Sequence, residues 1–321
     1  MTISARYIVK ELDRLGWDYR LIDEALAVME ITPPGCRSTT IKITKSEFDS
    51  SIGRYLANLK DVSYRLCKEA GISVPESQIF KNIKEGADFL KQLKMVVVKP
   101  DDGAHGEGVT TDIDNIEDLC RAVEYAKSLG YEKILVQEQA QGVDLRILFI
   151  DDQYMSSIIR HPAEVVGDGE HSVVELIKAE NSKESRGIGY SRDLNEINID
   201  AAKLYLNDSI NKIPESGEII QVIGAANIGL GGTSEDITNT INPDIIEAAR
   251  TAKNACRVTH AGVDFMIPDP TAEVSESNKL SFIEVNAGPM LAFHENPNIG
   301  KGVNVSNAYL NWLKDQLSMR N

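Results

Sequence analysis

The chain has 321 residues, a formal net charge of −15 and 42% hydrophobic residues. This length predicts two or three subdomains around a shared cleft. The acidic balance argues against extended nucleic-acid binding, because neutralising phosphates requires a basic surface. No apolar run is long enough to span a membrane and the first residues lack a signal-peptide pattern, so we expect a cytoplasmic protein without a membrane partner. The four cysteines show no CxxC or Cys/His cluster, which argues against a disulfide framework and a structural zinc site.

The first part of the chain reads as a small α/β unit. Its pattern predicts a helix over 5–15 and strands over 17–23, 25–31 and 39–45. The stretch 51–70 is helical in pattern and ends at Gly71, as helices often do.

From there on, helices and strands alternate, which predicts α/β layering. The expected helices cover 82–93, 116–129, 167–181 (after a turn), 243–257 and 306–317. The expected strands cover 95–100, 133–139, 144–150 and 154–160 as a hairpin, 218–224, 262–268 and 279–290. Two glycine-rich loops lie at 101–109 and 227–236, and the segment before 218 is simply polar.

The first chemical motif is "VVVKPDDGAHGEG". Lys99 follows three valines, so its ammonium is expected where a buried strand ends. Gly103, Gly106 and Gly108 allow backbone N–H groups in the next loop to approach an anion closely. This order suits phosphate binding, although the pattern is not Walker A. An ordinary flexible hairpin tip is an equally good interpretation of this motif alone.

Three oxygen-bearing side chains lie on two predicted strands that end the fold. Asp264 lies among apolar residues in "GVDFM", and Glu284 and Asn286 share one face of "FIEVNA", because side chains two apart on a strand point the same way. A buried carboxylate is costly unless it is paired or bound to a cation. The set suits Mg²⁺, and without Cys or His it does not suit zinc. A strand-end capping role would explain one such residue but not three.

The segment "ILVQEQAQGVDLRI" is the third motif. An adenine ring could lie on it, with backbone N–H and C=O groups of the segment contacting the base edge and Asp144 accepting hydrogen bonds from the ribose hydroxyls. Solvent-facing residues of a hairpin are an equally good interpretation until the order of the motifs is considered.

That order resembles the ATP-grasp superfamily, and most closely the ligase domains of cyanophycin synthetase and bifunctional glutathione synthetase. The shared motifs stand here as "VVVKPDDGAHGEGV", "RHPAEVVGDGEHSVVELI", "AANIGLGGTSEDITNTINP", "GVDFMIPDP" and "EVNAGPM". The resemblance covers nearly everything from 51 to the end. It implies an α/β (α+β) ATP-grasp fold with a pre-grasp segment at 1–56, a small lid subdomain at 57–138 and a C-terminal subdomain with the metal site at 139–321.

The resemblance also implies roles for individual residues. ATP and Mg²⁺, or Mn²⁺ in its place, would be the cofactors, with Asp264, Glu284 and Asn286 as metal ligands. The nucleotide would be bound by Lys60, Lys99, the loop with Gly103, His105, Gly106 and Gly108, the hinge residues Gln137 and Glu138, and Asp144.

Substrate residues follow less directly. Arg160 in "IIRHPA" matches a family position and could pair with a substrate carboxylate through its planar fork, although a surface ion pair is the alternative. Asn227 and Arg186 are weaker candidates. The relatives carry an arginine before the "AAN" motif where this chain has Ile223 or Gly224, and Arg257 is one residue that could replace it.

These features predict an ADP-forming carboxylate–amine ligase that joins amino acids or small peptides through an acyl phosphate. Two alternatives stay open: a non-catalytic ATP-binding module, favoured by the missing arginine, and a carboxylate kinase with a non-amine acceptor. The sequence names neither substrate, and it leaves homo-oligomer formation open.

Overall fold

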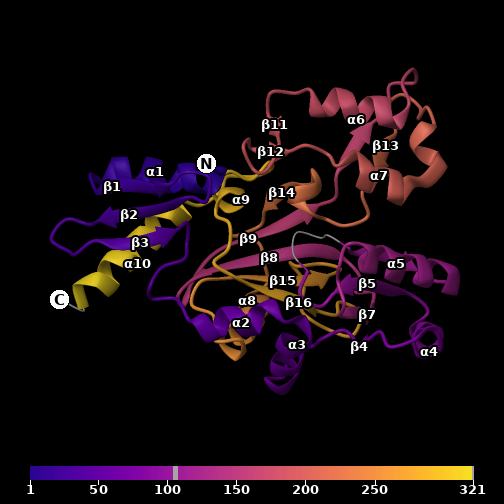
Figure 1. Cartoon of the computed structure of the whole chain (residues 1–321), viewed down its shortest axis with the longest axis horizontal. Helices are drawn as coiled ribbons and strands as arrows, with labels where there is room; N and C mark the ends of the chain where they lie inside the picture. Colours follow the sequence, from indigo (N-terminus) through magenta and orange to yellow (C-terminus); the bar gives the residue numbers. More distant parts are fainter. Residues whose placement is uncertain (104–107, 320–321) are drawn as a thin grey trace.

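The structure is a computed structural model that describes residues 1–103 and 108–319. His105 and Gly106 of the predicted phosphate loop lie outside the described residues. The described chain forms a central five-stranded sheet with three smaller units around it (Figure 1). In the part of the chain described, no helix is both long and apolar enough to cross a membrane.

The central sheet is antiparallel throughout, with the order β14-β9-β8-β15-β16. Its strands are β8 (Val143–Ile150), β9 (Gln153–His161), β14 (Thr233–Asp236), β15 (Ala261–Ile267) and β16 (Ser281–Ala287). Helices α2 (Ser51–Asn58), α3 (Lys60–Glu69) and α8 (Pro243–Ala255) pack on its apolar face, and α9 (Ala292–Glu295) lies near β9. The apolar face presents Leu145, Ile147, Phe149, Val263, Phe265, Phe282 and Val285. Since strand side chains alternate, the opposite face of the same strands is free to carry polar groups.

A four-stranded sheet with the order β4-β7-β5-β6 forms the lid unit beside α3 and β16 (Figure 1). Its elements are β4 (Ser77–Ile79), α4 (Ile83–Leu93), β5 (Val96–Pro100), β6 (Thr110–Ile113), α5 (Ile116–Ser128) and β7 (Ile134–Glu138). Helices α4 and α5 begin at Asn82 and Asn115, whose side chains accept hydrogen bonds from the first turns. This unit has its own core, which includes Leu90, Val98, Leu119 and Val136.

The N-terminal unit contains both ends of the described chain (Figure 1). It consists of α1 (Ile3–Leu15), β1 (Asp18–Asp23), β2 (Val28–Thr32), β3 (Thr39–Lys42) and α10 (Val305–Met319). Ile8 and Leu12 of α1 share one core with Tyr309 and Leu310 of α10 and with Leu148 of β8. The last helix therefore packs with the first fifty residues as well as with the central sheet.

A fourth unit, between β9 and β14, covers one end of the central sheet. It contains β10 (Glu164–Val166), α6 (Val173–Asn181), β11 (Arg186–Gly187), β12 (Leu194–Asn195), α7 (Ile199–Leu206), η1 (Asn207–Asn211), β13 (Ile219–Gln221) and η2 (Ile228–Leu230). Helix α6 begins with a capping box between Ser172 and Glu175.

The structure differs from the sequence prediction in several elements, including the short strands β6 (Thr110–Ile113) and β10 (Glu164–Val166), which the patterns did not indicate. The helical stretch 51–70 is two helices, because the backbone at Leu59 is extended and ends α2. Part of the "polar" segment is α7, and the second glycine-rich loop ends in strand β14. In addition, α3 belongs to the predicted 57–138 subdomain, yet Tyr64 and Cys67 join the core of the central sheet.

Candidate functional site

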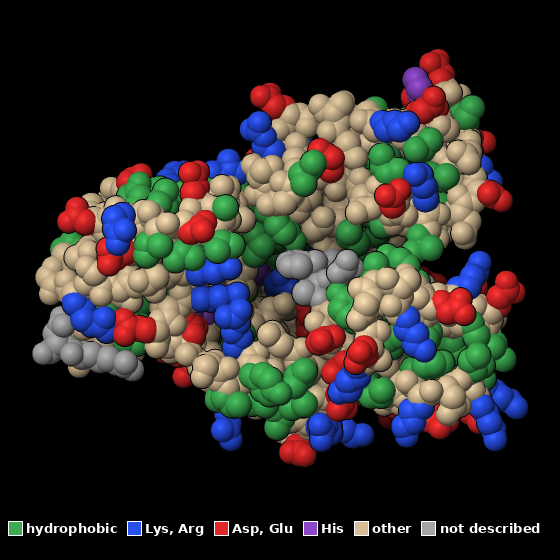
Figure 2. All heavy atoms as spheres, in the orientation of Figure 1, with side chains coloured by type: hydrophobic (Ala, Val, Ile, Leu, Met, Phe, Trp, Pro, Cys, Tyr) green, Lys and Arg blue, Asp and Glu red, His purple; other side chains and the backbone are tan. Residues whose placement is uncertain are grey.

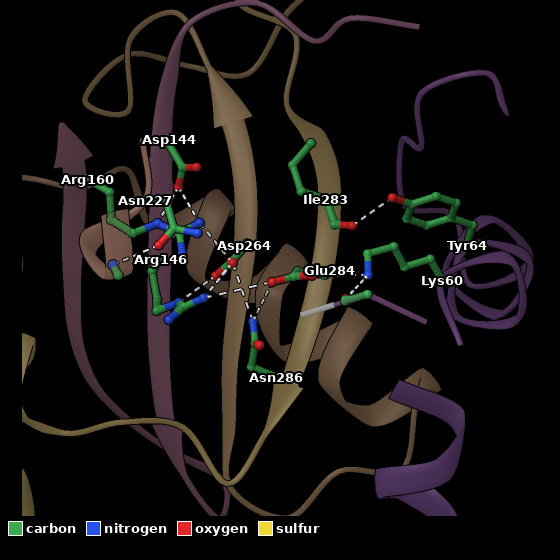
Figure 3. Close-up of polar contacts among 12 residues, drawn as sticks. Lys60, Tyr64, Asp144, Arg146, Arg160, Asn227, Asp264, Ile283, Glu284 and Asn286 are labelled. Carbon is green, nitrogen blue, oxygen red and sulfur yellow. Dashed lines mark hydrogen bonds and ion pairs between the residues drawn. The ribbon is translucent and has the colours of Figure 1, made fainter. Parts of the chain in front are cut away.

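The polar face of the central sheet gathers five charged side chains and one amide from four neighbouring strands. Across β15 and β16, Asp264 pairs with Glu284 and Gly262 with Asn286. Across β15 and β8, Asp264 pairs with Arg146, and Asp144 of β8 pairs with Arg160 of β9. Figure 3 shows these side chains pointing toward one another above the strands. Register alone therefore assembles the group.

Asp264 lies at the centre of this group and is only 1% exposed. Arg146 donates two hydrogen bonds to the Asp264 carboxylate, from Nε to Oδ1 and from Nη2 to Oδ2, both of 2.7 Å. Arg160 donates to Oδ2 at 2.9 Å and to Asp144 Oδ1 at 2.7 Å. Burial opposes ionisation of Asp264, but the two guanidinium groups outweigh it and lower its pKa. Burial raises the pKa of Asp144 to about 6, although Arg160 lies against it.

Glu284 and Asn286 complete the predicted triad. The Asn286 amide nitrogen donates to Glu284 Oε1 at 3.0 Å and to Asp264 Oδ2 at 3.3 Å, so the three side chains converge. Asp264 Oδ1 accepts one bond, from Arg146, so a lone pair remains for a cation. The donor set of two carboxylates and one amide consists of hard oxygen ligands, which fits Mg²⁺. No cluster of three His, Cys, Asp or Glu occurs among the described residues, so the amide is needed to complete a triad.

Two lysines face this triad from the other side of the cleft. Lys60, at the start of α3, lies 4.0 Å from Glu284 Oε2 and donates to the Gly103 carbonyl at 2.7 Å. Lys99 of β5 donates to the Tyr64 hydroxyl at 2.7 Å, and Tyr64 in turn donates to the Ile283 carbonyl on β16 at 2.9 Å. Figure 3 shows Lys60 pointing at Glu284, and Tyr64 at Ile283. Burial lowers the pKa of Lys99 to about 8, although Glu284 and Asp101 favour its charged form.

The predicted hinge residues Gln137 and Glu138 are the last two residues of β7. Gln137 is 2% exposed, and its Nε2 has no hydrogen-bond partner in the described part of the chain. Glu138 accepts from the Glu76 backbone N–H at 3.2 Å and pairs with Lys279 at 3.5 Å. Asp144 lies on the polar face against Arg160, so its role at the ribose stays a prediction.

The other predicted substrate residues are placed differently. Asn227 begins η2, accepts from the Gly229 N–H at 2.7 Å and lies near Arg160 in Figure 3. Arg186 is buried in the fourth unit, where it donates to the Asn195 and Gly231 carbonyls. Arg257 is exposed after α8, and no described contact joins it to the triad. No hydrogen bond or ion pair in the described part of the chain joins Asn227 or Arg257 to Arg160 or to the triad.

Two residues of this site were missed in the sequence. Arg146 sits in "DLRI", two positions after Asp144, and the same alternation that linked Glu284 with Asn286 would have placed it on the polar face. No sequence motif pointed to Tyr64, because its hydrogen bond with Lys99 depends on how α3 packs between the two sheets.

Comparison with known proteins agrees with this geometry. Residues 68–171 match the family model for the ATP-grasp domain of prokaryotic glutathione synthetase. The crystal structure of a bifunctional glutathione synthetase from Pasteurella multocida superimposes on 99% of this chain and 44% of that chain, with a TM-score of 0.70 and 26% identity. The chain has the ATP-grasp fold.

Sequence relatives confirm the resemblance found in the motifs. Cyanophycin synthetase from Trichormus variabilis is 28% identical over 317 residues, which are 97% of this chain and 35% of that protein. The glutathione biosynthesis bifunctional protein of Pasteurella multocida is 30% identical over 280 residues, 84% of this chain and 37% of that protein. The chain thus spans about a third of the length of these curated relatives.

A more distant structure supports the ATP-grasp fold alone. The D-alanine–D-alanine ligase from Bacillus anthracis matches 85% of this chain and 70% of that chain, with a TM-score of 0.50 and 14% identity. The predicted fold class is therefore confirmed.

Proposed function

We propose that this chain is an ATP-dependent carboxylate–amine ligase. It would activate a carboxylate as an acyl phosphate, and an amine would then displace the phosphate, leaving an amide, ADP and phosphate. The observation that carries the proposal is the convergence of Asp264, Glu284 and Asn286 on one sheet face, with Lys60 4.0 Å from Glu284. Its support from known proteins is the similarity to synthetases over nearly the whole chain.

The phosphate groups would bind between the lid and the central sheet. Lys60 and Lys99 would supply positive charge. The loop predicted from its sequence to bind phosphate, with Gly103, His105, Gly106 and Gly108, would add backbone N–H groups, although His105 and Gly106 lie outside the described residues. Two anions must approach each other in this reaction, and fixed cations in a dry site offset their repulsion. The burial of Lys99 supports such a site.

The nucleoside would lie along the hinge. Backbone groups at Gln137 and Glu138 would contact the adenine edge. Asp144 would accept hydrogen bonds from the ribose hydroxyls once its ion pair with Arg160 opens. The buried Gln137 amide with an unpaired Nε2 is a polar group available for a ligand.

The metal would be Mg²⁺, with Mn²⁺ as a substitute, held by Asp264, Glu284 and Asn286. A divalent ion at this point supplies charge neutralisation for phosphate oxygens. The side chain of Glu284 is 29% exposed, so it is accessible to an ion from the cleft.

Arg160 is the proposed anchor for the substrate carboxylate, with Asn227 beside it. Arg146 lies on the same face and is a better substitute for the missing family arginine than the exposed Arg257. The substrates would be amino acids or small peptides. The unpaired cysteines agree with a cytoplasmic location.

The test measures ADP release from Mg-ATP against a matrix of amino acids and short peptides, singly and in pairs, with mass spectrometry of every positive well. A ligase requires pair-dependent ADP formation and a product lighter than its two substrates by one water. ADP formation with a single acid and hydroxylamine only would indicate a carboxylate kinase. Mg-ATP binding without ADP formation anywhere in the matrix would favour a binding module.

A further inference from the structure

Lys45 lies in a tight turn that follows β3 in the N-terminal unit. The turn is closed by two backbone bonds between Lys42 and Lys45, of 2.8 and 3.0 Å. The hydroxyl of the buried Thr44 donates to the Pro289 carbonyl at 3.0 Å. Pro289 follows β16, so the N-terminal unit is fixed directly against the end of the strand that carries Glu284 and Asn286.

The stem of Lys45 lies on the backbone of Gly288, two residues after Asn286. A Cβ atom at position 288 would come within 2.4 Å of the Lys45 Cε, and Gly288 has a positive φ of 69°. Glycine suits this position, because the positive φ disfavours other residues and a Cβ would displace the Lys45 side chain. The next residue, Pro289, is 3.2 Å from the Cβ position of Gly262, which also faces the Arg146 side chain at 3.4 Å. Lys45 is thus held at the same end of the strands as the arginine group.

The charge of Lys45 has no partner in the described chain. Its side chain is half-buried, and no ion pair joins it to a described carboxylate. Burial lowers the pKa of Lys45, and the nearby Arg54 and Lys42 lower it further, while Asp49 offsets this only in part. Asp49 itself accepts two bonds from Ser46. Such an unpaired, partly desolvated cation is costly and marks a candidate site for an anion.

An unpaired lysine is unusual in a chain with this excess of acidic residues. The chain carries 49 acidic and 34 basic residues, so a random surface lysine finds acids more often than bases nearby. Figure 2 nevertheless shows Lys and Arg side chains gathered beside the hollow at the centre of the displayed face. A local group of basic side chains attracts anionic ligands even when the protein as a whole is acidic.

We infer that Lys45 is a specificity-determining residue that binds an anionic group of a substrate, separate from the carboxylate that is activated. The inference rests on the proposed ligase function. It implies that one substrate is an amino acid or peptide with an additional carboxylate. It also makes the N-terminal unit, which precedes the ATP-grasp motifs, part of the substrate site.

The position of Lys45 separates this role from phosphate binding. Lys60 faces Glu284 from α3, and Lys99 faces the cleft from the lid sheet. Lys45 approaches from the opposite unit, beyond Asn286 and next to Gly288. A change at Lys45 should therefore affect the anionic substrate and not ATP.

The experiment compares wild type with Lys45→Met, Lys45→Arg and the control Lys10→Met. Methionine keeps an unbranched stem over Gly288 and removes only the charge, and arginine keeps the charge. Lys10 is an exposed lysine on α1 of the same unit, so its replacement makes the same change in net charge. The substrates are acids with a second carboxylate and their half-amides, such as aspartate and asparagine or glutamate and glutamine, each with a panel of amines.

For Lys45→Met we expect a KM for the dicarboxylic substrate about 10- to 100-fold above wild type, as for the loss of one charge-assisted hydrogen bond. The KM for ATP should stay within about twofold. Lys45→Arg should recover at least half of the loss on a logarithmic scale, and Lys10→Met should match wild type. Equal KM values for the dicarboxylic substrate in wild type and Lys45→Met would overturn the inference, as would turnover restricted to substrates with one carboxylate.

A binding measurement decides the inference if no pair of substrates turns over. Calorimetric titration of succinate and of its half-amide, succinamate, uses protein saturated with Mg-ADP. The inference requires tighter binding of succinate than of succinamate to wild type, and a preference that disappears in Lys45→Met but not in Lys10→Met. Absence of any preference overturns the inference. Absence of turnover alone counts against the ligase proposal instead.

Discussion

At the scale of single residues, the site depends on Asp264, which is held between two guanidinium groups. Both Arg146 and Arg160 bond it, and it is almost fully buried. Replacing Asp264 with Asn leaves the two buried guanidinium groups with Asp144 beside Arg160 and only the more distant Glu284, 3.9 Å away, beside Arg146. We expect the free energy of unfolding to fall by about 3 kcal/mol, the usual cost of breaking a buried ion pair. Urea denaturation measures this, and an unchanged midpoint would show that the two arginines do not depend on Asp264.

Glu284 provides the contrast, since it makes weaker contacts within the protein. Within the described residues its one hydrogen bond is from Asn286, while Lys60 and Arg146 lie 4.0 and 3.9 Å away. For Glu284→Gln we expect stability within about 1 kcal/mol of wild type. We also expect at least a 100-fold loss of Mg-ATP turnover, because one carboxylate ligand is lost. Wild-type-like activity in this variant would remove Glu284 from the metal site.

Lys99 predicts how ATP binding depends on pH. Burial lowers its pKa from 10.5 to about 8, so the free protein loses this positive charge as the pH rises through 8. Bound phosphates favour the charged form, so affinity should fall above pH 8. Between pH 7 and pH 9 we expect the Kd for Mg-ATP to rise about tenfold, the effect of one such group.

The control for this titration is Lys99→Arg, since arginine stays charged over the whole range. Calorimetry at pH 7, 8 and 9 should give a nearly constant Kd for this variant. A tenfold rise in Lys99→Arg as well would assign the pH dependence to another group.

At the scale of elements, the connection from β7 to β8 joins the lid to the central sheet. Gly142 lies in it with φ +105°, and a Cβ there would come within 2.1 Å of the Ile267 carbonyl carbon. Gly142→Ala should therefore cost more than about 2 kcal/mol of stability, since both the backbone and the contact oppose a side chain.

Gly130 is the matched control for this substitution. It also has a positive φ, of 92°, but a Cβ there meets nothing within 4 Å. Gly130→Ala should cost about 1 kcal/mol, the strain of the backbone alone. The difference in melting temperature between the two variants measures the cost of the close approach of position 142 to the Ile267 backbone. Equal losses of stability would show that this approach does not constrain the connection from β7 to β8.

Local patterns predicted most elements of this fold. The alternation in 144–150 and 154–160 predicted the β8–β9 hairpin, and the pairing of Glu284 with Asn286 on one face follows from the same period of two. The helices predicted over 82–93 and 116–129 are present as α4 and α5, and the structure shows Asn82 and Asn115 capping their first turns. These features depend on neighbours in sequence, which a sequence displays directly.

The features that were missed depend on packing between distant segments. The break at Leu59 carries no proline or glycine, yet it places the Lys60 N–H against the Asp101 carbonyl at 3.3 Å and turns the Lys60 side chain to the cleft. Arg146 was overlooked because its partner Asp264 lies 118 residues away. Strand order, which brings them together, was not available from either motif alone.

At the scale of the whole molecule, the N-terminal unit is built from both ends of the chain. Helix α10 packs against α1, and both bury Leu148 and Ile150 of the central sheet. The lid, by contrast, has a core of its own. The stability of the N-terminal unit should therefore be linked to α10 and not to the lid.

Two core substitutions test this division. Leu310→Ala in α10 removes a fully buried side chain, and Leu90→Ala in α4 removes a comparable one from the lid core. Each should cost about 3 kcal/mol locally, because a buried leucine leaves a cavity. We expect Leu310→Ala to speed amide hydrogen exchange in α1 and β1–β3 while β5 and β7 stay protected. Leu90→Ala should give the reverse pattern. Faster exchange in both units with either variant would show that the molecule opens as one cooperative body, since a shared opening exposes both cores together.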